Sequence, residues 1–322
     1  MSLTPPARSD LEPMVAPHES TDQMREAQSE SQSPSPTPSH NASMDMTLSR
    51  VCPLPQGAIH FGVLGEGPPV LLIMGFMARG HGWRSQVEAL STHYHLAWFD
   101  HRGVGDSPGP AASSMAGFAQ DCVALLDHLG WESAHIFGVS MGGMIAQEVA
   151  LRAPERVRSL TLIVTQAGGV TSVIPPRRGI PFFLRAQLTR TPETRIQALK
   201  SLLIPADNWS AEEEREIERR LREEFTPKPP LSTRIRHLWA ILRHRTYDRL
   251  STINTPTLVV QAREDLLVKP KHSETIAQLI PHARLLSLSG AGHGVIRQSK
   301  IELNGELTQH LSEAETQWSS AR

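Results

Sequence analysis

The stretch Gly138-Val139-Ser140-Met141-Gly142-Gly143 decides the fold of this 322-residue chain, and apolar residues flank it on both sides. Glycines stand two residues before and two residues after Ser140, at Gly138 and Gly142. A strand that turns sharply into a helix needs such glycines, because the two backbones come too close there for side chains. The spacing therefore predicts a strand, a tight turn that exposes Ser140, and a helix whose positive dipole end begins directly behind the serine. The alternative is a glycine-rich helix start with an idle serine.

Strand and helix patterns alternate outward from this stretch. We expect strands at residues 58–64, 69–74, 94–99, 134–137, 157–165, 257–261 and 283–288, and helices at 83–92, 115–129, 270–279 and from the last strand to about 313. The continuous apolar run at 69–74 is typical of a strand that is covered on both faces. This alternation predicts an α/β fold, with a mostly parallel, doubly wound sheet and helices on both of its faces.

The first 48 residues have a different composition from the rest of the chain. Nine serines and seven prolines stand before residue 46, and large apolar residues are sparse and show no period. Such a segment cannot bury enough apolar surface to offset the entropy lost on folding. We therefore predict that residues 1–48 form a disordered tail.

A second departure lies at residues 170–250, which carry helix patterns but no strand pattern. One of these helices, at 232–245, places four apolar residues on a single stripe: Ile235, Leu238, Trp239 and Leu242. We expect a sheet domain of residues 49–169 and 251–322 that is interrupted by a helical insertion at 170–250.

Composition limits the partners and the compartment. The formal net charge is −1 at pH 7, so the overall charge gives no reason to expect nucleic acid or an anionic membrane as a partner. Two cysteines, Cys52 and Cys122, provide neither a disulfide framework nor a metal-ligand cluster. No apolar run is long enough to span a bilayer, and no secretory apolar region follows the N-terminus, so we expect a cytoplasmic protein.

A serine nucleophile needs a base to take its proton and a carboxylate to orient that base. Asp265 follows the strand expected at 257–261, and His293 follows the last strand between two glycines. The chain order serine, acid, histidine is the one expected when the serine stands on a strand-to-helix turn. Glu264 neighbours Asp265 and is a rival for the acid, whereas no carboxylate ends the strand at 157–165.

The motifs in this order resemble the α/β-hydrolase fold superfamily, in its single-domain form with a helical cap, from about residue 50 onward. The matching stretches are Leu72-Ile73-Met74-Gly75-Phe76 with Trp83, Phe99 to Ser107, the Ser140 turn, Glu264 to Pro270, and Gly292-His293. The resemblance implies that the backbone N–H groups of Phe76 and Met141 form an oxyanion hole. It also implies that Asp100, Arg102 and Ser107 stabilise a turn.

Two positions depart from the family pattern. Met74 stands where the family often has histidine, and Ala262 stands where it often has glycine. Family members with methionine at the first position resemble esterases and antibiotic-pathway methylesterases, so the departure bears on the substrate. A helical cap would shape the acyl pocket, and its candidate pocket residues are Phe182, Phe183, Leu184, Trp209 and Trp239.

The resemblance and the three candidate side chains imply a serine hydrolase that cleaves small carboxylic esters through an acyl-enzyme, without metal or cofactor. A carbon–carbon bond hydrolase, a lactonase or a perhydrolase would carry the same motifs. An epoxide hydrolase or dehalogenase would need aspartate in place of Ser140. A non-catalytic receptor or scaffold is the remaining class. The sequence leaves the oligomeric state open.

Overall fold

The computed structural model describes residues 46–169, 172–189, 191–205 and 209–320. Their centre is an eight-stranded sheet in the order β1-β2-β4-β3-β5-β6-β7-β8. The strands are β1 (Arg50–Leu54), β2 (Gly57–Leu64), β3 (Pro69–Ile73), β4 (His95–Phe99), β5 (Ala134–Val139), β6 (Val157–Ile163), β7 (Thr257–Ala262) and β8 (Arg284–Leu288). Only the pairs β1·β2 and β2·β4 are antiparallel. The predicted α/β fold class is confirmed.

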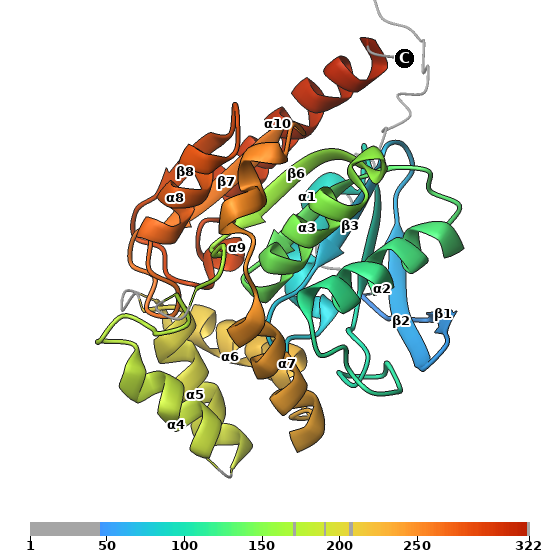
Figure 1. The fold of residues 1–322 in the computed structure, drawn as a ribbon. Coiled ribbons are helices and arrows are strands. Elements are labelled where there is room, and N and C mark those ends of the chain that lie inside the picture. The colour runs from blue at the N-terminus through green and yellow to red at the C-terminus, as the bar shows by residue number, and fades with distance from the viewer. Residues whose placement is uncertain (1–45, 170–171, 190, 206–208, 321–322) are drawn as a thin grey trace, which may run out of the picture. The chain divides into compact units, whose positions relative to one another are not determined.

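Helices cover both faces of the sheet (Figure 1). On one face, α1 (Arg84–Leu90) and α10 (Lys300–Ser320) pack with the Val70 side of β3 in one apolar cluster. On the other face, α2 (Met115–His128), α3 (Met141–Arg152) and α8 (Lys271–Leu279) pack with the Leu71 side of the same strand. Both sides of β3 are therefore buried, which explains its unbroken apolar sequence.

The Ser140 turn lies at the carboxyl edge of the central strands. β5 pairs in parallel with β3 and β6, with Gly138 opposite Ile73 and Val139 opposite Ile163. β7 and β8 continue the parallel order beyond β6. The loops after β3, β5, β7 and β8 consequently meet at one edge, where open α/β sheets place their ligands.

The ends of the packed chain differ from the sequence-based expectation. Met46 and Leu48 are buried, and the Trp98 indole N–H donates to the Met46 carbonyl at 3.4 Å, so packing begins inside the segment that we assigned to the tail. The predicted disorder of residues 1–45 lies outside the described residues.

The edge strand β1 was not predicted, because its short mixed sequence shows no period. The last helix runs to Ser320, beyond the expected end near 313.

Four helices, which we call the cap helices, lie between β6 and β7 beside the carboxyl edge (Figure 1): α4 (Ile180–Leu188), α5 (Pro192–Leu203), α6 (Ala211–Phe225) and α7 (Leu231–Arg243). Thr191 caps the N-terminus of α5, and Ser210 and Glu213 form a capping box at α6. The short helices η1 (Gly80–Trp83), η2 (Pro154–Arg156), η3 (Tyr247–Thr252) and α9 (Val295–Gln298) complete the described chain. None of the described helices has the length and apolar character needed to cross a bilayer.

The orientation of α7 corrects an expectation. An apolar stripe on a helix usually faces the core, but Ile235 and Trp239 of this stripe are more than half exposed. The buried side of α7 instead carries Thr233, His237 and Ala240. His237 on that side packs against the Phe76 and Phe118 rings, and the apolar stripe is left outside.

Candidate active site

The turn between β5 and α3 holds Ser140 in a strained conformation, with φ at +56° and ψ at −120°. A Cβ on Gly138 would stand 2.3 Å from the Gly142 carbonyl oxygen, and a Cβ on Gly142 would stand 2.1 Å from the Ile73 carbonyl oxygen. Both positions therefore require glycine. The Ser140 N–H donates to the Ile163 carbonyl at 2.9 Å, which fastens the turn to β6.

Asp265 and His293 meet across the loops that follow β7 and β8. His293 Nδ1 lies 2.7 Å from Asp265 Oδ2, and both side chains are almost completely buried. The other oxygen, Asp265 Oδ1, accepts the backbone N–H groups of Leu267 at 2.7 Å and Val268 at 2.9 Å. With the carboxylate fixed by two backbone donors, Nδ1 is the ring nitrogen that donates, and Nε2 is left free to accept a proton.

The glycines around His293 allow a close contact with the end of α5. A Cβ on Gly292 would stand 2.3 Å from Pro205 Cδ, and the Gly294 N–H donates to the Leu203 carbonyl at 2.6 Å. The histidine loop is thereby held against the cap helices. Glu264, the rival acid, holds the same loop from the other side, because its carboxylate accepts the Ala291 N–H at 3.1 Å. Among the described residues, Glu264 forms no hydrogen bond or ion pair with His293.

Ser140 and His293 line one pocket, together with residues from the cap helices. Phe183 comes from α4, Leu199 from α5 and Phe225 from α6. The walls are mainly apolar, so the pocket suits an apolar group bound next to the serine.

The loop after β3 lies directly against the Ser140 turn. A Cβ on Gly75 would stand 3.1 Å from Ser140 Cβ, and Phe76 lines the same pocket as the serine. Met141 is the first residue of α3. Among the described residues, neither the Phe76 nor the Met141 N–H donates a hydrogen bond. Two backbone donors next to Ser140 are thus available to a bound ligand.

One charged pair is buried in the pocket wall. Glu224 at the end of α6 forms an ion pair with Arg297 of α9, and both side chains are largely buried. Burial, followed by the nearby charge of Arg220, lowers the pKa of Arg297 to about 10. Arg297 therefore stays charged at neutral pH, and the pair adds little net charge. Sequence reasoning missed it, because Glu224 belongs to a glutamate-rich helix that looks fully solvated.

Two buried histidines lie under the Phe76 loop. The His101 ring donates from Nε2 to the Met74 carbonyl at 3.0 Å, and its centroid is 6.0 Å from that of His237. His237 also packs against the Phe76 ring at 5.9 Å. Burial lowers the pKa of His101 to about 4, and burial together with His101 lowers the pKa of His237 to about 3. Both are neutral at pH 7 and serve as packing groups.

The turn-stabilising role of Asp100, Arg102 and Ser107 is confirmed. Asp100 accepts the Gly80 N–H at 2.7 Å, and Arg102 donates two hydrogen bonds to Asp121 at 2.9 and 3.0 Å. The Ser107 hydroxyl donates to the Asp100 carbonyl at 2.7 Å. None of the three lines the pocket at Ser140.

The five cap residues that were expected at the pocket lie in different places. Phe183 lines it, whereas Phe182 lies in a separate surface groove with Asp265, and Trp209 lies in a further groove. Leu184 and Trp239 are exposed, so the expectation that they line the pocket is wrong. No cluster of metal-ligating side chains occurs in the part of the chain that the structure describes.

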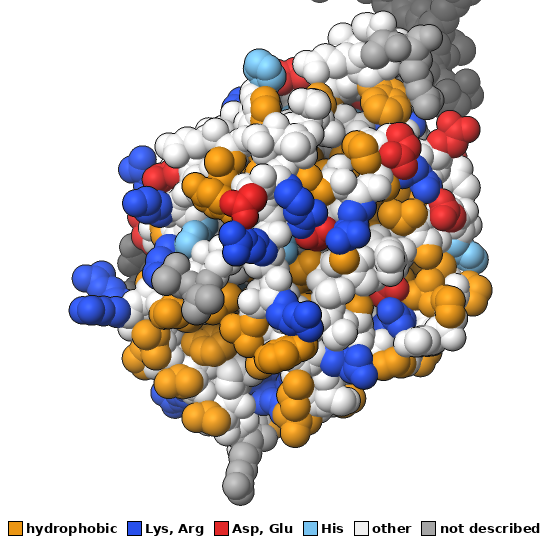
Figure 2. All heavy atoms as spheres, viewed as in Figure 1, with side chains coloured by type: hydrophobic (Ala, Val, Ile, Leu, Met, Phe, Trp, Pro, Cys, Tyr) orange, Lys and Arg blue, Asp and Glu red, His pale blue; other side chains and the backbone are white. Residues whose placement is uncertain are grey.

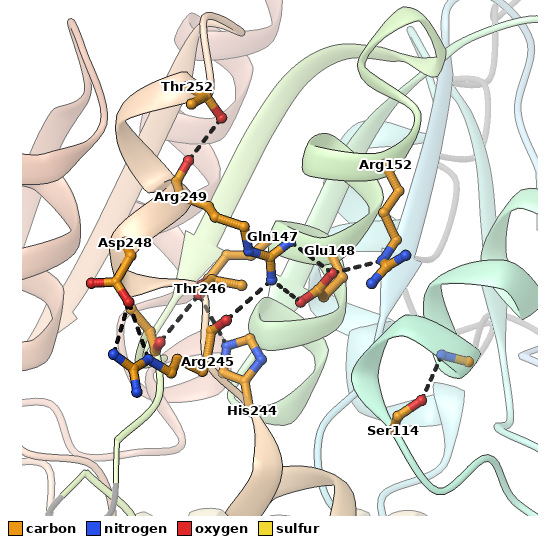
Figure 3. Close-up of polar contacts among 12 residues, drawn as sticks. Ser114, Gln147, Glu148, Arg152, His244, Arg245, Thr246, Asp248, Arg249 and Thr252 are labelled. Carbon is orange, nitrogen blue, oxygen red and sulfur yellow. Dashed lines mark hydrogen bonds and ion pairs between the residues drawn. The ribbon is translucent and has the colours of Figure 1, made fainter.

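A polar network ties the chain beyond α7 to the helix behind Ser140 (Figure 3). Arg249 donates to Glu148 of α3 at 2.5 Å, and Arg152 donates to the same carboxylate at 2.8 Å. The Thr246 hydroxyl donates to Gln147 at 2.5 Å. Burial alone would raise the pKa of Glu148, but the hydrogen bonds from the two arginines lower it. The cap helices are thereby anchored to α3.

Comparison with known proteins agrees with this geometry. A protein of Azorhizobium caulinodans named "Putative carbamate hydrolase RutD" is 33% identical over 240 residues, which cover 73% of this chain and 88% of that protein. The enol-lactonase from Burkholderia xenovorans LB400 superposes with a TM-score of 0.69 at 24% identity, covering 80% of this chain and 97% of its own. Est816, named as an N-acyl homoserine lactone degrading enzyme, superposes with a TM-score of 0.67 at 29% identity and covers 81% of this chain and 99% of its own.

A family model described as the alpha/beta hydrolase fold matches residues 68–297. The matched range runs from β3 to α9 and includes Ser140, Asp265 and His293. The match confirms the resemblance that the motifs indicated, and this chain belongs to the alpha/beta hydrolase fold family.

Proposed function

We propose that the protein is a serine hydrolase that cleaves carboxylic esters of small molecules through an acyl-enzyme. The observation that carries the proposal is the 2.7 Å contact between His293 Nδ1 and Asp265, in a pocket that His293 shares with the strained Ser140. A hydroxyl needs a nearby base, and this base has its second nitrogen free.

In the first half of the reaction, Ser140 Oγ attacks the ester carbonyl and His293 Nε2 takes the hydroxyl proton. Asp265 holds the ring in this tautomer and stabilises the imidazolium. The carbonyl oxygen becomes an oxyanion that accepts the N–H groups of Phe76 and Met141. When the tetrahedral intermediate collapses, the proton moves from His293 to the leaving alcohol, and the acyl group stays on Ser140.

In the second half, a water molecule gives its proton to His293 and attacks the acyl carbonyl. Collapse releases the carboxylic acid and returns the proton to Ser140 Oγ, so the enzyme is regenerated without a cofactor. The apolar wall formed by Phe183 and Leu199 would hold the acyl group. The helices at 170–250 act as a cap that keeps bulk water from the acyl-enzyme.

Hydrolysis of a carbamate or a lactone is the second candidate. The carbamate is favoured by the name of the relative that is 33% identical to this chain, and the lactone by the name of Est816. The chemistry at the carbonyl is the same, but the group that leaves from a carbamate is an amine. An amine must be protonated to leave, so this reaction depends more strongly on proton donation by His293.

A substrate panel separates these candidates. p-Nitrophenyl esters of increasing acyl length, an acyl lactone and a simple carbamate are compared under one condition, with Ser140→Ala as the blank. The proposal expects kcat/KM to be highest for an ester and to fall by several orders of magnitude in the blank. Preference for the carbamate or the lactone would select the second candidate, and equal turnover by Ser140→Ala would refute the serine mechanism.

A further inference from the structure

Helix α7 presents its apolar side to the exterior. Leu231, Ile235, Trp239 and Leu242 are exposed by 62%, 55%, 52% and 51%, and all lie on the outer side of the helix. The inner side carries the buried His237 described above. Exposed leucines are common singly, but a stripe along a whole helix marks a surface that another partner covers.

Helix α4 also exposes apolar side chains. Leu184 and Leu188 are exposed by 49% and 76%, while Phe183 and Gln187 of the same helix line the pocket at Ser140. Figure 2 shows hydrophobic side chains gathered over the region of α4 and α7, with Lys and Arg side chains among them. We call the exposed apolar residues of the two helices the cap face: Leu184, Leu188, Leu231, Ile235, Leu238, Trp239 and Leu242.

The charges on these two helices have one sign. α7 carries Arg234, Arg236 and Arg243, α4 carries Arg185, and neither helix contains an acidic residue. Among the described residues, these four arginines form no ion pair, but Arg234 is half-buried and Arg236 donates to the Ala111 carbonyl at 3.5 Å. The arginines of α6 behave differently, because Arg219, Arg220 and Arg222 each pair with a glutamate. The overall charge of −1 therefore conceals basic, apolar helices at α4 and α7.

The composition of the cap face favours a membrane surface over a second copy of this chain as its binding partner. A second copy of this chain would bring arginines against arginines, which disfavours self-association. Exposed leucines with a tryptophan and several arginines are instead typical of helices that lie in a membrane interface. There the apolar side chains enter the acyl boundary and the guanidinium groups bind lipid phosphates. Arg243 already lies over the Trp239 ring, 6.0 Å from its centroid, so both groups can reach the same headgroup layer.

We propose that the cap face binds the surface of an anionic phospholipid bilayer. The helices lie on the membrane and do not span it. Because α4 faces the bilayer with Leu184 and Leu188 and the pocket with Phe183, the bound protein holds its pocket next to the lipid. The proposal rests on surface composition and is independent of the proposed esterase activity.

The test is co-sedimentation of the full chain with sucrose-loaded vesicles at 0.1 M NaCl. Vesicles of phosphatidylcholine alone are compared with vesicles that contain 30% phosphatidylglycerol. We expect binding to the anionic vesicles only, with partitioning that falls when the salt is raised to 0.5 M.

Two double variants separate the contributions of charge and apolar contact. Arg236→Gln with Arg243→Gln should lower partitioning about 30-fold, since each basic side chain near an anionic surface contributes about fivefold. Trp239→Ser with Leu242→Ser should lower it at least about tenfold. Ile301→Ser is the matched control, because Ile301 is 85% exposed on α10, outside the cap face. It should leave partitioning unchanged.

Three outcomes would overturn the proposal. One is equal partitioning of wild type and both double variants. A second is equal binding to neutral and anionic vesicles. The third is a stable dimer by light scattering that the Trp239→Ser/Leu242→Ser variant dissociates, because the occupant would then be a second copy. All substituted residues are exposed, so the melting temperatures of the variants should match that of wild type, and this is checked in each case.

Discussion

Replacing Asp265 by asparagine tests the proposed catalytic triad of Ser140, Asp265 and His293. Both carboxylate oxygens of Asp265 have hydrogen-bond partners in the structure. Oδ1 of this residue accepts two backbone N–H groups, from Leu267 and Val268. In the variant the amide oxygen must keep these two bonds, because an amide nitrogen there would face two donors. The amide NH₂ group is therefore directed at His293 Nδ1. That nitrogen becomes an acceptor, and the ring proton moves to Nε2.

The consequence for catalysis follows from the tautomer. A ring protonated at Nε2 cannot take the Ser140 proton, and a change of this kind lowers kcat by about 10⁴-fold. Such a loss corresponds to about 5.4 kcal/mol in the activation barrier. The fold should be little affected, since asparagine has the size of aspartate and keeps the backbone hydrogen bonds.

The assay is the initial rate of p-nitrophenyl ester hydrolysis at pH 7.5, with thermal melting measured on the same preparation. Glu264→Gln is the matched control, because Glu264 is the adjacent acid and its carboxylate accepts the Ala291 N–H. It should keep its rate within about threefold, as expected for a residue outside the triad. A loss below tenfold in a folded Asp265→Asn variant would refute the assignment of the acid.

Three further predictions concern stability. Gly142→Ala should prevent stable folding or lower the melting temperature by more than 10 °C, because the new Cβ would stand 2.1 Å from the Ile73 carbonyl oxygen; an unchanged melting temperature would contradict the turn geometry. Arg297→Met should lower the free energy of unfolding by about 3–5 kcal/mol in urea titrations, because it leaves Glu224 buried and unpaired, and Glu224→Gln in the same chain should restore part of the loss. His237→Phe should flatten the fall in stability on acidification. The pKa of His237 is about 3 in the folded chain and near 6.5 when unfolded, so between these pH values only the unfolded state holds the proton. For each pH unit below 6.5 in this range, the free energy of unfolding of wild type should fall by up to about 1.4 kcal/mol more than that of the variant. Parallel plots of unfolding free energy against pH would refute this.

The sequence was informative wherever a local pattern has only one structural solution. The glycines around Ser140 and the unbroken apolar run of β3 predicted the turn and its place in the sheet, because close backbone approach and burial on both faces leave few alternatives. Asp265 and His293 could be predicted as neighbours because parallel strands end at a common edge.

The remaining features depend on packing that no local pattern encodes. Periodicity identified the apolar stripe of α7 but could not tell which way it faces, because His237 packs against the Phe76 and Phe118 rings, which lie far away in the sequence. The ion pair between Glu224 and Arg297 joins two helices that are far apart in the sequence, and neither residue looks buried in its own helix.

The most direct test of the central claim is covalent labelling of the intact protein by a fluorophosphonate probe, followed by peptide mass spectrometry. Such probes modify a serine hydroxyl only where a base and an oxyanion hole activate it. We predict one adduct per chain, located on Ser140, that is absent in Ser140→Ala and strongly reduced in Asp265→Asn. Labelling at another serine, or no labelling while a control hydrolase reacts, would contradict the claim that Ser140 is the nucleophile.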